Sequence, residues 1–327
     1  MRNFRIYFMA LTVLLVSGCG NERAVKTSQP VNIIFDTDIG SDCDDAGALA
    51  VLHKFADDGL VNIVGVIFSS GTNRYGVGAC DAINTWYGRG DLPLGQYKGS
   101  DVGDPNDHFT KLLATGKERF GHRVVDHCAD MIDVYKNVLE KQPDRSVTIV
   151  TVGHPHGLCH LMNSPKGMDL IRKKVIKCVS MAGTSPEPQR DWNFGRNGAE
   201  LYVRDFLERW PTDLYFSTAG KHILTGNKLL PLTPEDNPVR VAYENFFETI
   251  QTGRMSWDQV ALLFAVRPEL FSVESQGSLV QDDRYCTYWD TNKNNPKHHK
   301  VTPVISDEEL TVIIESMMAA RPANRRR

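Results

Sequence analysis

The chain has 327 residues, with 37 lysines and arginines against 40 aspartates and glutamates, which gives a formal net charge of −3. Because 41% of the residues are hydrophobic, the composition excludes a wholly disordered chain. The nearly balanced charge gives no electrostatic basis for binding nucleic acid. Seven cysteines without a CxxC pair are too few and too scattered for a disulfide scaffold.

The amino terminus has the order of features of a bacterial export signal. Arg2 and Arg5 form a basic start, and Ile6–Val16 is apolar apart from Thr12. This run is too short for a transmembrane helix, which needs about 20 residues, but it matches the hydrophobic region of a signal peptide. Small residues then precede Cys19, which resembles the bacterial lipoprotein box. At that motif the signal peptide is cleaved just before a cysteine, and the cysteine thiol is lipidated. An ordinary signal peptide with a chance cysteine is the alternative.

These features predict an exported lipoprotein, anchored to a bacterial membrane on its periplasmic or cell-surface side. The membrane would be reached through the lipid alone, because we find no other segment long and apolar enough to span it. The predicted organisation is a lipoprotein signal peptide over 1–18, lipidation at Cys19, a polar tether over 19–30 and a folded domain over 31–327.

Beyond the tether, strand-like and helix-like segments alternate. Strands are expected at Val31–Phe35, Asn62–Phe68, Val147–Val152, Lys174–Met181 and Leu214–Ser217. Helices are expected at Ala46–Phe55, Gly76–Tyr87, Asp130–Glu140, His156–Met162 and Gly198–Arg209. This alternation is typical of an α/β protein with a mostly parallel sheet flanked by helices and a Rossmann-like core. In such sheets ligands bind beyond the carboxyl ends of the strands.

Two polar stretches are expected to be loops. Residues 95–106 have loop-like composition, and so do residues 282–300, where at most one short strand is expected. His298 and His299 lie beside two lysines in the second stretch, and we expect them on a surface loop.

Five carboxylates follow the first expected strand within ten residues: Asp36, Asp38, Asp42, Asp44 and Asp45. Crowded carboxylates repel one another and raise each other's pKa values, and a divalent cation relieves that repulsion. Clustered hard oxygen ligands favour Ca²⁺ or Mg²⁺ over zinc. A solvated turn that caps the next helix is the alternative, but five acidic residues exceed what a cap needs. We therefore predict a metal site at this turn.

Two other kinds of acidic loop match less well. A calcium loop of the helix-loop-helix type needs a preceding helix and a glutamate at its twelfth position, where this chain has Gly47. A haloacid-dehalogenase-like phosphatase begins with a similar DxD after a strand, but needs threonine or valine where this chain has Gly40.

The segment Asp36–Leu49, DTDIGSDCDDAGAL, resembles the amino-terminal signature of the inosine-uridine-preferring nucleoside hydrolases, usually DxDxGxDDAxAL, with a spacing two residues longer. Weaker matches follow in the family's order, so that the resemblance covers about residues 31–270: Gly71–Asn73, Thr148–Leu158, Met181–Gly183, Asp191–Phe194 and Ser256–Asp258. The resemblance implies a nucleoside hydrolase-like α/β fold. It also implies calcium-dependent hydrolysis of the N-glycosidic bond of a ribonucleoside or related riboside by a metal-bound water.

The resemblance also implies roles for individual residues. Asp38 would bind Ca²⁺ and act as the general base on the attacking water. The other calcium ligands would be Asp45, the backbone carbonyl of Val152, and Asp258. Ribose contacts would come from Asp44, Asn73, Asp191 and Asn193, with Asp191 standing where the family usually has glutamate. Asp36 is expected to support the loop, Asp42 has no assigned role, and Cys43 is expected to pack in the interior.

Trp257 stands where many members of the family have a histidine that protonates the leaving base. An indole cannot supply that proton, although it can stack on a nucleobase or simply form an aromatic wall. His154 and His156, on the turn after Val152, are candidates for the missing acid. A solvated loop histidine is the alternative for each.

The predicted function is therefore calcium-dependent riboside hydrolysis with a small-molecule partner. The alternatives are a non-catalytic ribose- or nucleoside-binding lipoprotein and, less favoured by the residues, a Mg²⁺-dependent phosphatase. Members of the family tend to form dimers or tetramers, so a homo-oligomer is a further expectation.

Overall fold

The computed structural model describes residues 29–246 and 252–323. The predicted signal peptide, the lipidation site at Cys19 and most of the tether therefore lie outside the described residues. Within these ranges, no helix has both the length and the apolar character that crossing a bilayer would require.

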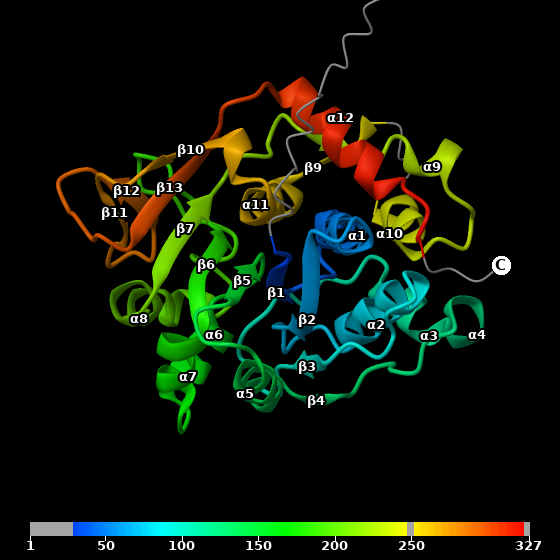
Figure 1. Ribbon diagram of the computed structural model, residues 1–327, viewed down its shortest axis with the longest axis horizontal. Helices are drawn as coiled ribbons and strands as arrows, with labels where there is room; N and C mark the ends of the chain where they lie inside the picture. The colour runs from blue at the N-terminus through cyan, green and yellow to red at the C-terminus, as the bar shows by residue number, and fades with distance from the viewer. Residues whose placement is uncertain (1–28, 247–251, 324–327) are drawn as a thin grey trace, which may run out of the picture.

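A nine-stranded sheet lies at the centre of the molecule, in the order β10-β13-β7-β6-β5-β1-β2-β3-β4 (Figure 1). Every neighbouring pair is parallel except β10 and β13. The strands are β1 (Val31–Thr37), β2 (Val61–Phe68), β3 (Leu94–Gln96), β4 (Ala129–Asp130), β5 (Val147–Thr151), β6 (Val175–Met181), β7 (Asp213–Ser217), β10 (Phe271–Glu274) and β13 (His298–Pro303). The mostly parallel sheet predicted from the sequence is confirmed.

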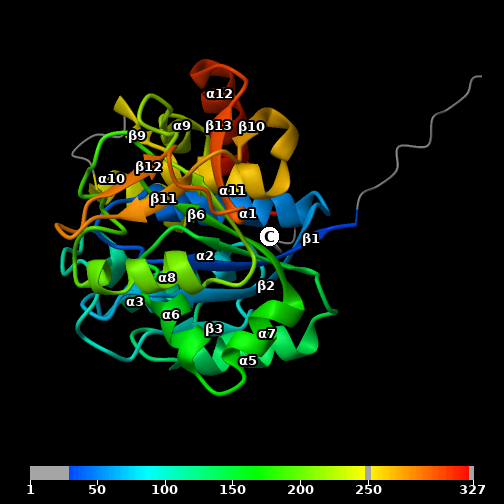
Figure 2. The same cartoon turned by 90° about the vertical axis from the view of Figure 1, so that its left-hand side faces the viewer.

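Helices cover both faces of this sheet (Figures 1 and 2). One face carries α1 (Asp44–Asp57), α2 (Gly76–Trp86), α10 (Pro238–Phe246), α11 (Trp257–Val266) and α12 (Asp307–Met318). The other face carries α5 (Met131–Lys141), α6 (His156–Asn163), α7 (Gly167–Lys174) and α8 (Val203–Arg209). Each layer buries its own apolar cluster against the sheet, and this burial is the main stabilising contribution to such a fold.

Shorter elements complete the described chain. They are α3 (Thr110–Thr115), α4 (Lys117–Phe120), α9 (Leu229–Leu232), the hairpin of β11 (Ser278–Gln281) with β12 (Thr287–Asp290), and the pair of β8 (Leu224–Thr225) with β9 (Arg254–Met255). Three-residue 3-10 helices lie at Ala199–Leu201 and Pro268–Leu270.

The strand order reverses at β1. Strands β2, β3 and β4 follow on one side of β1, and the chain then returns to place β5 on the other side. The carboxyl ends of β1 and β5 therefore form a topological switch point, where open α/β sheets leave a crevice for a ligand. Asp38 directly follows β1, and Val152 directly follows β5.

The expected strands and helices are present, with ends that differ by at most two residues, except that Gly198–Arg209 is divided into a 3-10 helix and α8. Both expected loops were partly wrong. Residues 95–106 include the end of β3. Residues 282–300 include β12, which matches the one short strand expected there, and also the start of β13, which was not expected.

His298 and His299 lie on β13, not on a surface loop. His298 is buried, with Nδ1 2.9 Å from Ser278 Oγ and Nε2 3.0 Å from the Leu207 carbonyl. The ring of His299 stacks on that of Tyr215, with 4.5 Å between centroids. The polar sequence of β13 conceals a strand that is formed by pairing with β7, far away in the chain.

The wild-type protein is expected to lose folding stability in mild acid, and replacing His298 by glutamine is expected to reduce that loss. Burial lowers the pKa of His298 from 6.5 to about 4, so between these values the unfolded chain binds a proton that the folded state does not. The free energy of unfolding therefore falls as the pH drops from 6.5, by up to about 1.4 kcal/mol per pH unit for one group.

Urea unfolding between about pH 7.5 and 4.5 measures this effect, with His222→Gln at an exposed histidine as the control. The His298→Gln protein should show a shallower pH dependence than wild type, while the control should not. Identical slopes for all three proteins would contradict a neutral buried ring at position 298.

Candidate active site

A cavity of about 610 Å³ lies at the switch point, beyond the carboxyl ends of the strands. Segments that are distant in sequence line it, among them the turn after β1, the residue after β5, the loop after β6 and the start of α11. The structure brings these predicted site residues to its wall: Asp38, Asp44, Asp45, Val152, Asp191, Asn193, Trp257 and Asp258. Their predicted roles remain proposals.

Asn73 is the predicted site residue that does not line this cavity. Its side-chain oxygen accepts hydrogen bonds from the Tyr75 backbone N–H at 2.9 Å and from Thr110 Oγ1 at 3.1 Å. Its amide nitrogen lies under Gly40, where an added Cβ would come within 2.0 Å of it. Gly40 has φ of 150°, so the turn needs glycine both for its backbone conformation and for this close approach. The structure thus places Asn73 as a support of the acidic turn.

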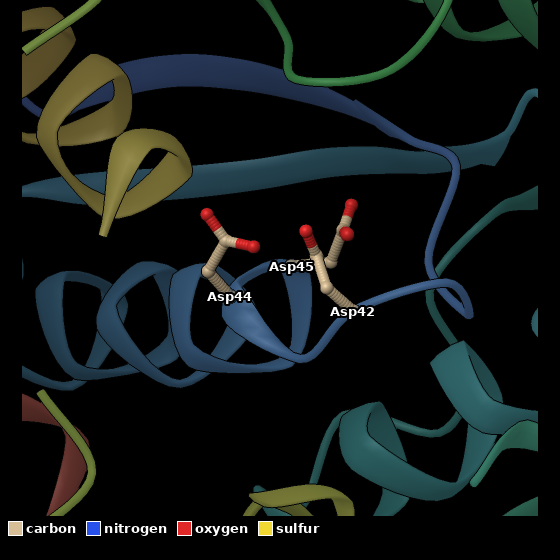
Figure 3. A group of neighbouring side chains, drawn as sticks. All are labelled: Asp42, Asp44 and Asp45. Carbon is tan, nitrogen blue, oxygen red and sulfur yellow. The ribbon is translucent and has the colours of Figure 1, made fainter. Parts of the chain in front are cut away.

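The acidic turn carries the predicted carboxylates into α1. Asp42, Asp44 and Asp45 project to the same side of the start of this helix (Figure 3), with one ligand atom of each within 4.8 Å of the others. Asp45 also accepts a hydrogen bond from Thr37 Oγ1 at the end of β1. This group shares Asp45 with the predicted calcium ligands but includes Asp42, for which no metal role was predicted.

Asp258 reaches the same cavity from the first turn of α11, outside the group of three carboxylates that lie within 4.8 Å of one another. That helix is apolar along most of its length and is buried among α1, the sheet and α12, which brings its first turn to the cavity. Asp44 Oδ2 and Asp258 Oδ1 are buried, and neither has a hydrogen-bond partner among the described residues. Buried polar atoms in native proteins are normally paired, so these two oxygens indicate a missing ligand.

Burial raises the pKa values of Asp38, Asp44, Asp45 and Asp258, and the neighbouring carboxylates raise them further. For Asp258, the carboxylates that add to the effect of burial are all on the acidic turn, Asp44 first. Such a cluster is unfavourable when ionised unless a cation lies among the oxygens. The hard oxygen donors and the unpartnered atoms fit a divalent cation such as Ca²⁺. Asp42, Asp44 and Asp45 lie close enough together to hold it, and the predicted ligands Asp38 and Asp258 line the same cavity.

The loop after β6 adds Asp191 and Asn193 to the wall. Asp191 Oδ1 accepts the backbone N–H groups of Asn193 at 3.0 Å and Phe194 at 2.9 Å, so this carboxylate also holds its own turn. Asn193 Nδ2 donates to the Val152 carbonyl at 2.5 Å. A carbonyl oxygen has two lone pairs, so the Val152 carbonyl keeps one acceptor position beside the acidic turn.

Neither histidine candidate for the leaving-group acid lines the cavity. His154 is buried, with Nε2 3.3 Å from Asp38 Oδ2 and Nδ1 3.1 Å from the Asn193 carbonyl. It therefore lies behind Asp38, close to that carboxylate, although its Nε2 makes no hydrogen bond within the described residues. His156 is also buried, packs edge-on against Tyr97 and has no side-chain hydrogen bond within the described ranges. The alternative of solvated loop histidines was wrong for both.

Asp36 and Cys43 do not line the cavity. Asp36 accepts a hydrogen bond from Tyr135 Oη on α5 at 2.5 Å and is not part of the cavity wall. Cys43 is fully buried in the apolar cluster that includes α1, as expected for a packing residue.

Arg254 is one of the lining residues that the sequence analysis missed. Its Nη2 lies 2.6 Å from Asp42 Oδ2, and its guanidinium carbon lies 5.1 Å from the ring centres of both Phe246 and Trp257. The one sequence signal of this residue was Asp42, a carboxylate of the longer acidic turn that had no assigned role and could therefore pair with a cationic side chain.

No family model matches the sequence, and no curated protein matches it either. Solved structures do match. An inosine-guanosine nucleoside hydrolase aligns with a TM-score of 0.67 and 15% identity, covering 88% of this chain and 98% of that one. An inosine-uridine-preferring nucleoside hydrolase from Bacillus anthracis gives a TM-score of 0.66 and 14% identity, covering 88% and 99%. This chain has the nucleoside hydrolase fold.

A type III effector protein shares this fold as well. The type III effector protein XopQ, solved in complex with adenosine diphosphate ribose, aligns with a TM-score of 0.64 and 14% identity, covering 90% of this chain and 95% of that one. The nucleoside hydrolase fold predicted from the resemblance is thus confirmed at the level of architecture, since identities this low carry the fold alone.

Proposed function

We propose that this protein hydrolyses the N-glycosidic bond of a ribonucleoside or a related riboside in a calcium-dependent reaction. The observation that carries the proposal is that Asp258 joins the Asp38–Asp45 turn at one cavity, with buried carboxylate oxygens that lack partners. The nucleoside hydrolase fold and its switch-point cavity support the same reaction class.

Bound among these oxygens, calcium would supply a positive charge that makes a water more acidic and attracts the ribose hydroxyls. Asp38 accepts the proton of the attacking water, with the buried ring of His154 packed behind it. Asp44, Asp191 and Asn193 bind the ribose from the cavity wall. As the bond to the base breaks, positive charge develops on the sugar ring, and the surrounding carboxylates stabilise it.

A non-catalytic riboside-binding lipoprotein is the second candidate. No histidine lines the cavity in the described part of the chain, and Trp257 stands where the family often has one. Both candidate functions include the same expectations of export, lipidation at Cys19 and assembly into a homo-oligomer. In either case the riboside would be met outside the cytoplasm.

The two candidates are separated by incubating the purified protein with p-nitrophenyl riboside, with calcium or with a chelator. We expect release of p-nitrophenolate and ribose in calcium and none with the chelator, because the leaving group needs no acid and the water needs the cation. Saturable riboside binding without turnover would support the binding protein. Release of phosphate from a phosphomonoester in Mg²⁺ would support the phosphatase.

A further inference from the structure

Arg254 is held on the cavity wall by three contacts. Its guanidinium forms an ion pair with Asp42 at 2.6 Å and lies over the rings of Phe246 and Trp257, and all four residues line the cavity. The side chain is only 19% exposed. Ion pairing and stacking on aromatic rings fix a guanidinium in one orientation, so Arg254 is preorganised before any ligand arrives.

The guanidinium still has donors to offer. Arginine carries five N–H groups, and the Nε of Arg254 is buried without a hydrogen-bond partner among the residues that the structure describes. The guanidinium lines the cavity and uses its Nη2 for Asp42, so its other Nη N–H groups are the donors that an acceptor on a ligand can reach.

The reaction proposed above needs such a group. When a glycosidic bond breaks, the bonding electrons move onto the leaving nitrogen, and a proton or a hydrogen-bond donor must stabilise them. The cavity wall carries no histidine within the described ranges, and its cations there are Arg190, Lys221 and Arg254. Arg190 and Lys221 are exposed, whereas Arg254 is partly buried and adjoins Trp257, beside the proposed calcium ligand Asp258.

We propose that Arg254 binds the leaving base and stabilises the negative charge that develops on it, an inference that rests on the proposed riboside hydrolysis. The bond between the anomeric carbon and the base nitrogen breaks, and both electrons stay with the base. The water oxygen bonds to the anomeric carbon, and its proton goes to Asp38. The base leaves as an anion hydrogen-bonded to Arg254, which keeps its own proton, and then takes a proton from solvent.

This role defines a substrate class. The favoured ribosides carry a base with a carbonyl oxygen or ring nitrogen that accepts a hydrogen bond and can hold negative charge, such as hypoxanthine or uracil. Trp257 and Phe246 both hold the guanidinium and offer the base an aromatic surface. Asp42 is a positioning residue in this arrangement, and the longer acidic turn is what brings it to Arg254.

The test compares inosine with p-nitrophenyl riboside in wild type and in Arg254→Met, which keeps the apolar stem but removes the charge and the donors. For inosine we expect kcat/KM to fall by about 100-fold to 1,000-fold, as when one preorganised donor is removed. For p-nitrophenyl riboside, whose leaving group is stable as an anion, we expect a change within about threefold. Retained activity on this second substrate also shows that the variant is folded and still forms the acidic site.

Two further variants sharpen the result. Arg267→Met, at an exposed arginine paired with Glu269 beyond the far end of α11, should leave both activities unchanged. Arg254→Lys should recover part of the inosine activity, because it restores a charge without the planar fork. Equal losses on both substrates in Arg254→Met would overturn the role of Arg254 but leave the proposed function standing. A wild-type protein that cleaves neither riboside would overturn both.

Discussion

Replacing Asp38 by asparagine is expected to lower the kcat for p-nitrophenyl riboside by about 1,000-fold, within the range of effects for a positioned general base. Asp38 lies directly after β1 on the cavity wall, with His154 3.3 Å behind it. Asparagine has nearly the same shape but cannot accept the proton of the attacking water. The rate is to be measured with saturating substrate and calcium, so that weaker binding of either does not lower it.

The matched control is Asp36→Asn, the same change two residues earlier in the chain. Asp36 is buried against Tyr135 and does not line the cavity, so the folded variant should keep its activity within about threefold. If Asp38→Asn retains more than about a tenth of the wild-type kcat, Asp38 is not the general base.

Calcium is expected to stabilise the wild-type protein against heat and to have little effect on Asp258→Asn. Binding to the folded state alone adds about 2.7 kcal/mol when the free ion is at 100 times its dissociation constant. Asparagine at position 258 removes one of the carboxylates that repel one another in the cluster, together with its unpartnered oxygen. In the presence of a chelator the variant should therefore unfold at a higher temperature than wild type.

Thermal unfolding with a chelator, with Ca²⁺ and with Mg²⁺ measures this prediction. Asp283→Asn is the control, because its side chain is 97% exposed and lies outside the cavity wall. It should show the full calcium response of the wild type. An equally large response in Asp258→Asn would mean that the ion binds elsewhere, for example at Asp42, Asp44 and Asp45 alone.

The sequence by itself determined the features whose signals are local. Apolar runs that alternate with helical segments predicted the parallel sheet, because a strand buried on both faces must be apolar along its whole length. The acidic turn was visible because its five carboxylates lie within ten residues of one another. The more distant site residues, such as Val152, Asp191 and Asp258, were predicted only from the family resemblance. All three line the cavity, which is consistent with that prediction.

Tertiary structure alone decided the features that depend on distant partners. β13 is a strand because it pairs with β7, although its own residues are polar. His154 turned out to face Asp38, and Asn73 to support Gly40, because packing sets the direction in which each side chain points. The pairing of Asp42 with Arg254 joins residues that are 212 positions apart in the chain. Such contacts gain their free energy only when the whole chain has folded, so no local pattern of residues records them.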